Sequence, residues 1–90
     1  MSHIIIFEHR NLHGGHKHVF TSEPNLNAGD DNFFNDRLSS FVILEGRWQF
    51  FRDSNFGSPA SNVLGPGVYG WVEDFGIPND SVSSLRLVGG

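Results

Sequence analysis

Short runs of β-branched and aromatic residues alternate with polar turns along the whole 90-residue chain. Runs of this kind, bounded by Gly, Pro, Asn and Ser, are typical of β-strands. No segment of ten or more residues has the helical spacing of apolar positions, and residues 72–75 have room for one helical turn at most. A surface loop with room for a short strand or turn is expected at 22–32. The expected strands are 4–7, 17–20, 40–44, 47–51, 60–64, 68–71 and 85–88, of which 60–64 is the weakest.

One six-residue segment occurs twice. Residues 35–40 are Asn-Asp-Arg-Leu-Ser-Ser, and residues 79–84, which start 44 positions later, are Asn-Asp-Ser-Val-Ser-Ser. The same offset relates 7–11 to 51–55, beginning with Phe and ending with Asn in both. A fixed offset with matched landmarks indicates one structural unit used twice.

Short strands at regular spacing with Gly and Pro turns predict an all-β sandwich. We expect two Greek key motifs of four strands each, about 1–45 and about 46–90, related by a pseudo-twofold axis. The eight strands form a single domain spanning 1–90, because the chain is too short for a second independent core.

The composition limits what can reinforce so small a domain. Apolar residues make up 38% of the chain, nine of them Phe. There is no Cys, which excludes a disulfide and a thiolate metal site. Good packing or a bound hard cation is therefore the available reinforcement.

The charge balance argues against nucleic acid as a partner. Six basic side chains stand against ten acidic ones, for a net charge of −4, whereas a nucleic-acid surface needs a basic face. No stretch approaches the length of a membrane span. The first residues lack the pattern of a signal peptide, which leaves a cytoplasmic location, or secretion with the signal removed, as alternatives.

Each six-residue segment carries hard oxygen donors. Asp36 and Asp80 are carboxylates, and Ser39 and Ser83 supply hydroxyls three residues further on. Together with backbone carbonyls, these are the ligands that Ca²⁺ takes, six to eight at a time. One such segment cannot surround an ion, so donors from elsewhere must complete each site.

At these residues the chain resembles the βγ-crystallin family. Both segments match that family's calcium motif, [Asn/Asp]-[Asn/Asp]-x-x-[Ser/Thr]-Ser. Each is preceded by the folded-hairpin signature aromatic-x-x-x-x-aromatic-x-Gly, at 7–14 and 51–58. The resemblance covers essentially the whole chain and is nearest to single-domain microbial βγ-crystallins. Two positions depart from it: Leu12 replaces an aromatic residue, and Ser58 replaces the hairpin glycine, where Gly57 is expected to absorb the strain.

The resemblance implies two Ca²⁺ ions at one end of the sandwich, with crossed loops, so that each motif serves both ions. Ser40 and Ser84 are expected to bond the turns rather than the metal. The implied ligands are Ser39, the Glu8 carbonyl and Asp80 at one ion, and Ser83, the Arg52 carbonyl and Asp36 at the other, with the backbone of Asn35 and Asn79 filling further positions.

Other interpretations remain open. The motif could be a loop in which Asn, Asp and Ser side chains bond the backbone. His9, His13, His16 and His18 crowd the first hairpin, where a solvated edge is the simpler interpretation and a Zn²⁺, Cu²⁺ or Ni²⁺ site the alternative.

For function, we expect a monomeric calcium-binding domain whose fold the ion stabilises. The alternative is a structural or interaction module, related to inhibitor or sugar-binding domains, in which calcium is incidental. No nucleophile elbow, His-Glu-x-x-His or phosphate loop is present, so an enzyme is not expected.

Overall fold

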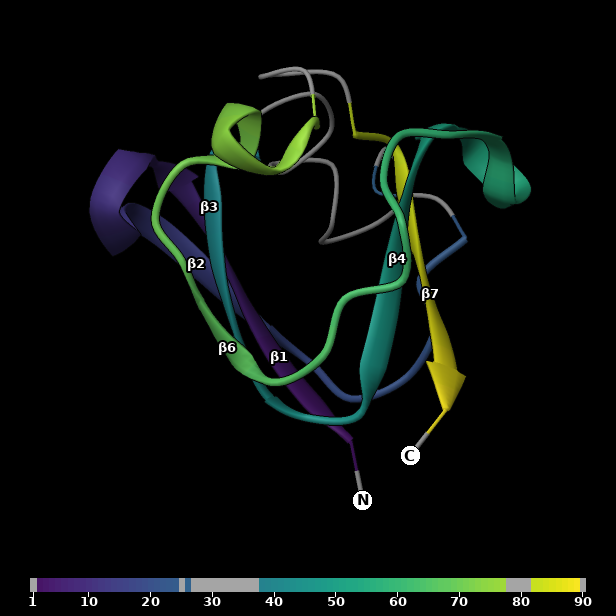
Figure 1. Ribbon diagram of the computed structural model, residues 1–90, viewed down its shortest axis with the longest axis horizontal. Coiled ribbons are helices and arrows are strands. Elements are labelled where there is room, and N and C mark those ends of the chain that lie inside the picture. The colour runs from purple at the N-terminus through teal and green to yellow at the C-terminus, as the bar shows by residue number, and fades with distance from the viewer. Residues whose placement is uncertain (1, 25, 27–37, 78–81, 90) are drawn as a thin grey trace.

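Two antiparallel β-sheets face each other in the computed structural model, which describes residues 2–24, 26, 38–77 and 82–89 (Figure 1). The 3-10 turns gather at the end of the molecule away from both chain ends. In the described residues the strands are β1 (His3–His9), β2 (His13–Val19), β3 (Ser40–Glu45), β4 (Arg47–Asp53), β5 (Gly57–Pro59), β6 (Gly67–Tyr69) and β7 (Ser84–Gly89), and the 3-10 turns are η1 (Arg10–Leu12), η3 (Ser54–Phe56) and η4 (Val72–Phe75).

The two halves of the chain exchange strands between the sheets. One sheet has the order β2-β1-β3-β6, so β6 of the second half completes the sheet of the first half. The other has the order β5-β4-β7, and Glu23 of the first half forms a bridge with Leu85 on β7. This exchange is the Greek key arrangement. The predicted all-β sandwich is confirmed.

Alternation along the strands places the core between the sheets. Ile4 and Ile6 on β1 point inward and are fully buried, while Ile5 between them lies on the outer face. Trp48, Phe41 and Phe50 are the largest fully buried side chains. The hydrophobic residues in the fourth position of the repeated segments, Leu38 and Val82, are buried too. Each full burial of this size contributes roughly 1.5–3 kcal/mol before entropy is subtracted.

The two folded hairpins repeat an unusual backbone conformation. Asn11 and Leu12 have φ of 59° and 61°, and the matching Asn55 and Phe56 have φ of 57° and 61°. Asn tolerates this left-handed region because its short polar side chain bonds locally, whereas Leu and Phe adopt it at a cost of about 1–2 kcal/mol each. Something outside the hairpins must therefore hold them.

The glycine position of each hairpin also has positive φ. Gly14 has φ of 83°, and an added Cβ would collide with the His9 ring. Ser58 has φ of 52° in the second hairpin. Gly57 next to it is extended, at φ −88°, so the expectation that Gly57 absorbs the strain is wrong. The serine itself carries it.

The expected strand 60–64 is wrong. Only Leu64 bridges to Trp48, and β5 lies earlier, at Gly57–Pro59, where a turn was expected. The reason is local: Phe50 N–H donates to the Ser61 hydroxyl at 3.1 Å, so a side chain replaces the next backbone hydrogen bond between the strands.

The helical turn at 72–75 is confirmed as η4. No helix in the described part of the chain is long and apolar enough to cross a membrane.

We expect Ser58→Gly to stabilise the domain. Glycine removes the left-handed penalty of a side chain, while its extra freedom in the unfolded chain offsets part of the gain. The net effect should be up to about 1 kcal/mol, which corresponds to at most about 4–8 °C in Tm for a domain of this size. Calorimetry or thermal circular dichroism measures it. Ser54→Gly is the matched control, since Ser54 lies in the same hairpin without a positive φ. A gain at Ser54 and none at Ser58 would contradict the assignment of strain.

Candidate metal centre

The structure describes half of the predicted ligand residues. Glu8, Ser39, Arg52 and Ser83 lie within the described residues, and the other four, Asn35, Asp36, Asn79 and Asp80, lie outside them. What can be tested is therefore how the serines and the carbonyl-bearing residues are brought together.

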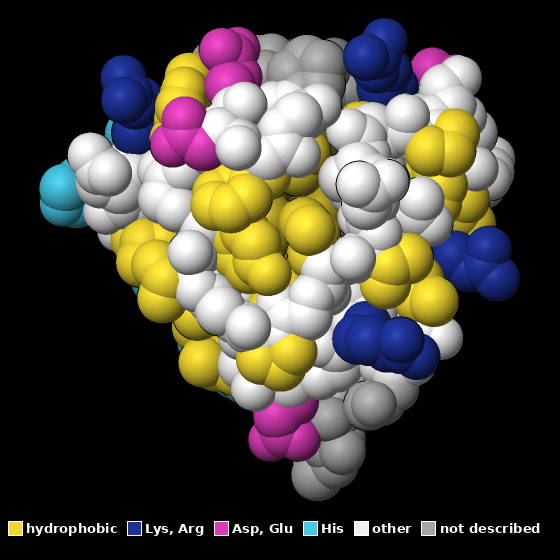
Figure 2. Space-filling view, viewed as in Figure 1, with side chains coloured by type: hydrophobic (Ala, Val, Ile, Leu, Met, Phe, Trp, Pro, Cys, Tyr) yellow, Lys and Arg dark blue, Asp and Glu magenta, His cyan; other side chains and the backbone are white. Residues whose placement is uncertain are grey.

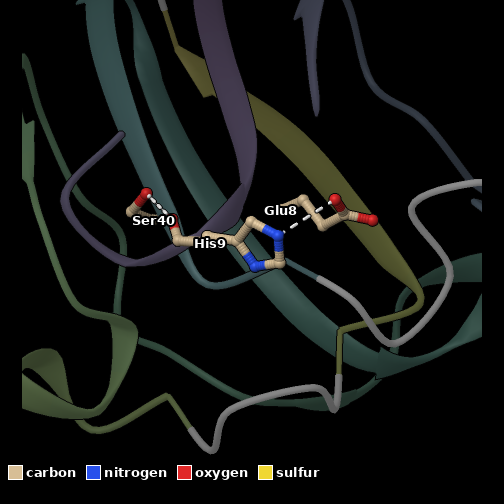
Figure 3. Close-up of polar contacts among 3 residues, drawn as sticks. All are labelled: Glu8, His9 and Ser40. Carbon is tan, nitrogen blue, oxygen red and sulfur yellow. Dashed lines mark hydrogen bonds and ion pairs between the residues drawn. The ribbon is translucent and has the colours of Figure 1, made fainter. Parts of the chain in front are cut away.

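Ser39 lies directly beside Glu8. Its backbone N–H donates to the Phe7 carbonyl at 3.0 Å, and Ser39 is 5% exposed. The register of β1 against β2 shifts between Phe7 and His9, so Glu8 stands at a β-bulge. Bulges re-aim the backbone next to functional sites. The Glu8 carboxylate is 3.3 Å from His9 Nε2, so the side chain interacts with its neighbour in the hairpin (Figure 3).

The second half repeats this contact. The Ser83 N–H donates to the Phe51 carbonyl at 3.0 Å, which places Ser83 next to Arg52. Arg52 itself is exposed. Each serine of the repeated segment is thus seated against the strand that bears the carbonyl assigned to the same ion.

Backbone bonds cross between the halves at the same residues. The Ser39 carbonyl accepts from Val72 N–H at 3.0 Å, and the Ser83 carbonyl accepts from Leu26 N–H at 2.9 Å. Ile77, the last described residue before the second segment, donates to the Val72 carbonyl at 3.1 Å. Val72, which precedes the second repeated segment, is therefore bonded to Ser39 of the first.

The hairpins cross in the same way. Asn11 N–H donates to the Gly70 carbonyl at 2.8 Å, and Asn55 N–H donates to the Pro24 carbonyl at 2.7 Å. Sequence reasoning missed these partners. Pro24 and Gly70 are 46 positions apart rather than 44, so the offset of the repeated segments does not align them, and a search allowing two extra residues could have found them.

Ser40 and Ser84 fasten the hairpins. The Ser40 hydroxyl donates to the His9 carbonyl at 2.6 Å (Figure 3). It also accepts from Leu12 N–H at 3.0 Å. The Ser84 hydroxyl donates to the Asp53 carbonyl at 2.6 Å and accepts from Phe56 N–H at 3.2 Å. Both serines are fully buried. The prediction that they bond the turns is confirmed.

Acidic side chains stand near the anchors. Glu73 and Asp74 are exposed on η4, which follows directly from Val72. Both are negatively charged and lie just after Val72, which is bonded to Ser39. Among residues 2–24, 26, 38–77 and 82–89, no three His, Asp or Glu side chains are grouped to hold a metal. On the face in Figure 2 the Lys and Arg side chains are scattered around the rim.

An open hollow of about 320 Å³ lies elsewhere on the surface. Among the residues that the structure describes, its lining contains no Asp, Glu, His, Lys, Arg, Tyr or Cys, and Ser61 is its one hydroxyl. The lining residues are Pro59, Ala60, Ser61, Asn62, Phe75 and Gly76.

Comparisons with known proteins agree with this architecture. The family model described as Beta/Gamma crystallin matches residues 3–88. A beta/gamma-crystallin of Ciona intestinalis is 35% identical over 86 residues, which are 96% of this chain and 98% of the relative. The solved structure of a betagamma-crystallin from an archaeon aligns with a TM-score of 0.84 at 36% identity, covering 97% of this chain and 98% of that one. A structure described as a transition-metal-ion-binding betagamma-crystallin from Methanosaeta thermophila aligns with a TM-score of 0.79 at 34% identity, covering 93% and 98%.

Ser40→Ala and Ser84→Ala should each destabilise the domain by about 1–3 kcal/mol. Each substitution leaves a carbonyl and an N–H of a hairpin without their partner, and a buried unsatisfied group costs that amount. Chemical denaturation measures the change. The two losses should be similar, because the two hydroxyls make the same bonds. A near-neutral result at both positions would show that the hairpins hold themselves.

Proposed function

The chain belongs to the beta/gamma-crystallin family, and we propose that it is a calcium-binding domain that holds two Ca²⁺ ions between its repeated segments. The observation that carries the proposal is the seating of Ser39 beside Glu8 and of Ser83 beside Arg52, each through a 3.0 Å backbone bond. Two equivalent positions therefore present a serine next to a strand carbonyl.

The donor chemistry fits calcium. The first position combines the hydroxyl of Ser39 and the carbonyl of Glu8, and the second combines those of Ser83 and Arg52. All four are neutral hard oxygens, which suit Ca²⁺ and leave the charge to be supplied by carboxylates. In the proposal Asp80 serves the first ion and Asp36 the second, with the backbone of Asn35 and Asn79 completing the set and water filling the remainder.

The crossing of the backbone supports a shared arrangement. The carbonyls of Ser39 and Ser83 are bonded to Val72 and Leu26 respectively, each of which comes from the other half of the chain. A residue that precedes each repeated segment is thus hydrogen-bonded to a serine of the other repeated segment.

Calcium is proposed to stabilise the fold, because the donors converge only when the halves are interlocked. An ion that binds the folded state alone adds about 2.7 kcal/mol per site at a hundredfold excess over Kd. That contribution is large beside the 5–15 kcal/mol that typical domains possess.

The identity of the ion has one competitor. The Methanosaeta thermophila relative is described as binding transition-metal ions, so the titration should include such ions. Oxygen donors favour Ca²⁺, whereas imidazole and thiolate favour the transition metals. The family fold is structural, and a role as an interaction module stiffened by calcium is the second candidate.

Calcium should raise Tm by many degrees, and titration calorimetry should count two ions. Saturating two sites adds several kcal/mol, and 1 kcal/mol corresponds to about 4–8 °C for a domain of 60–100 residues. Mg²⁺ should act weakly, because it demands a small octahedral shell and gives up water reluctantly. Identical melting curves in EDTA and in excess Ca²⁺ would refute the stabilisation.

Neighbouring serines provide a matched pair of variants. Ser39→Ala removes a proposed ligand, so it should reduce the calcium-dependent rise in Tm and weaken one site. Ser40→Ala removes a hairpin bond, so it should lower Tm in EDTA and leave the calcium-dependent rise intact. The same contrast should hold for Ser83→Ala against Ser84→Ala. If the rise in Tm were unchanged in Ser39→Ala and Ser83→Ala, the ligand assignment would be wrong.

Ser83→Arg is the more severe test. A guanidinium at this position replaces a donor by a cation, which repels the ion it should bind. Calorimetry should then count one ion instead of two. Two ions in this variant would contradict the site.

A further inference from the structure

Three histidines lie on the outer face of the four-stranded sheet, away from the proposed calcium positions. His3 is on β1, and His16 and His18 are on the edge strand β2. In the register of this pair of strands, His18 stands opposite Ile5. His3 is therefore its diagonal neighbour on the same face, within reach of a long side chain.

Two of these rings meet nitrogen to nitrogen. His3 Nε2 lies 2.8 Å from His18 Nδ1. His16 and His18 are neighbours as well, with ring centroids 5.4 Å apart at 72°, an edge-on contact between rings. The sequence pointed to a cluster of His9, His13, His16 and His18 in the first hairpin. The structure instead selects His3 as the partner of His18.

Packing holds the pair in place. The His3 ring stacks on Phe20, with centroids 4.6 Å apart and an interplanar angle of 26°. The Ser2 hydroxyl donates to the Phe20 carbonyl at 2.9 Å, which fastens the start of β1 next to that ring. His3 is half-buried and His18 is exposed, so the nitrogens meet where an ion in solution can reach them.

We propose that His3 and His18 form a transition-metal site that prefers Cu²⁺ or Ni²⁺. A ring nitrogen without a proton has a lone pair for a metal, and imidazole suits these ions. At the present contact one nitrogen must donate and the other accept. When a metal ion binds, the shared proton moves through solvent to the other nitrogen of its own ring, and both rings turn so that the two lone pairs point at the ion.

Before any rotation of the rings, the separation of the nitrogens is closer to a right-angled pair of ligand positions than to a tetrahedral pair. With metal–nitrogen bonds of about 2.05 Å, nitrogens 2.8 Å apart subtend roughly 86° at the ion, whereas a tetrahedral angle needs them roughly 3.3 Å apart. An angle near 90° matches neighbouring positions of the square-planar or octahedral shells of Cu²⁺ and Ni²⁺ rather than the tetrahedron of Zn²⁺.

Two protein ligands are all that the site requires, with water filling the other positions. In the described residues no three His, Asp or Glu side chains are grouped to hold a metal, so His16 is not counted as a ligand. His3 and Glu8 are five positions apart on β1, about 16 Å along an extended strand. The histidine site and the proposed calcium positions can therefore be filled independently.

The test is titration of the full chain with CuCl₂ in a buffer that does not bind copper, with Ca²⁺ in excess. The amino terminus is acetylated, because a free terminal amine two residues before His3 could chelate Cu²⁺ alone. The wild type should take up one ion with two equatorial nitrogens in its electron paramagnetic resonance spectrum. His3→Ala and His18→Ala should each weaken binding at least tenfold and leave the melting curve in EDTA nearly unchanged.

His16→Ala and His13→Ala are the controls, and both should bind copper like the wild type. Unchanged binding in His18→Ala would overturn the site, as would a loss in His16→Ala equal to that in His3→Ala. Cu²⁺ outcompetes other ions at most nitrogen sites, so Ni²⁺ against Zn²⁺ is the informative comparison. Tighter binding of Zn²⁺ than of Ni²⁺ would overturn the proposed geometry.

Discussion

A buried serine hydroxyl that bonds two backbone groups holds each folded hairpin. Ser40 and Ser84 each bridge a strand carbonyl to the N–H of a residue with positive φ. Leu12 and Phe56 would leave the left-handed region if nothing held them there, because their side chains are strained in it. Buried bonds to backbone partners are costly to leave unmade, so they can hold this conformation.

The same hairpins lock the halves together. Asn11 reaches Gly70, and Asn55 reaches Pro24, so each hairpin is bonded to the half of the chain that it does not belong to. Strand exchange acts in the same direction, since β6 completes the sheet of the first half. Neither half can bury its core face without the other. Any ligand held between the halves must therefore act on the stability of the whole domain.

The architecture could be predicted from the sequence because the two halves of the chain share residue types at matching positions. The repeated segments and their buried fourth positions, Leu38 and Val82, were visible as a pattern. The bonding role of Ser40 and Ser84 was predicted with the help of the family resemblance. Strand 60–64 was not, because a side-chain bond from Ser61 replaces the ladder there, and no periodicity records such a bond.

The features that the sequence did not predict depend on backbone angles and on strand register, which a pattern of residue types does not record. The strain at Ser58 arises because Ser58, and not the neighbouring Gly57, has the positive φ. The contact between His3 and His18 depends on strand register, which brings together residues 15 positions apart. Of the candidate calcium site, the pairing of Ser39 with Glu8 and of Ser83 with Arg52 was implied by the family resemblance. Their anchors Val72 and Leu26 come from segments that repeat with a different offset.

The two adjacent serines of each repeated segment have different structural roles. The second serine, Ser40 or Ser84, is buried. It hydrogen-bonds the hairpin that follows Glu8 or Arg52, the residue whose carbonyl is assigned to the ion. The first serine is bonded through its backbone to that strand and to the opposite half. Glu8 and Ser39 are therefore positioned by hydrogen bonds within the protein itself. Donors placed in advance lower the ordering cost of binding. A calcium ion at this position would thus add its binding energy to a frame that backbone hydrogen bonds have already built.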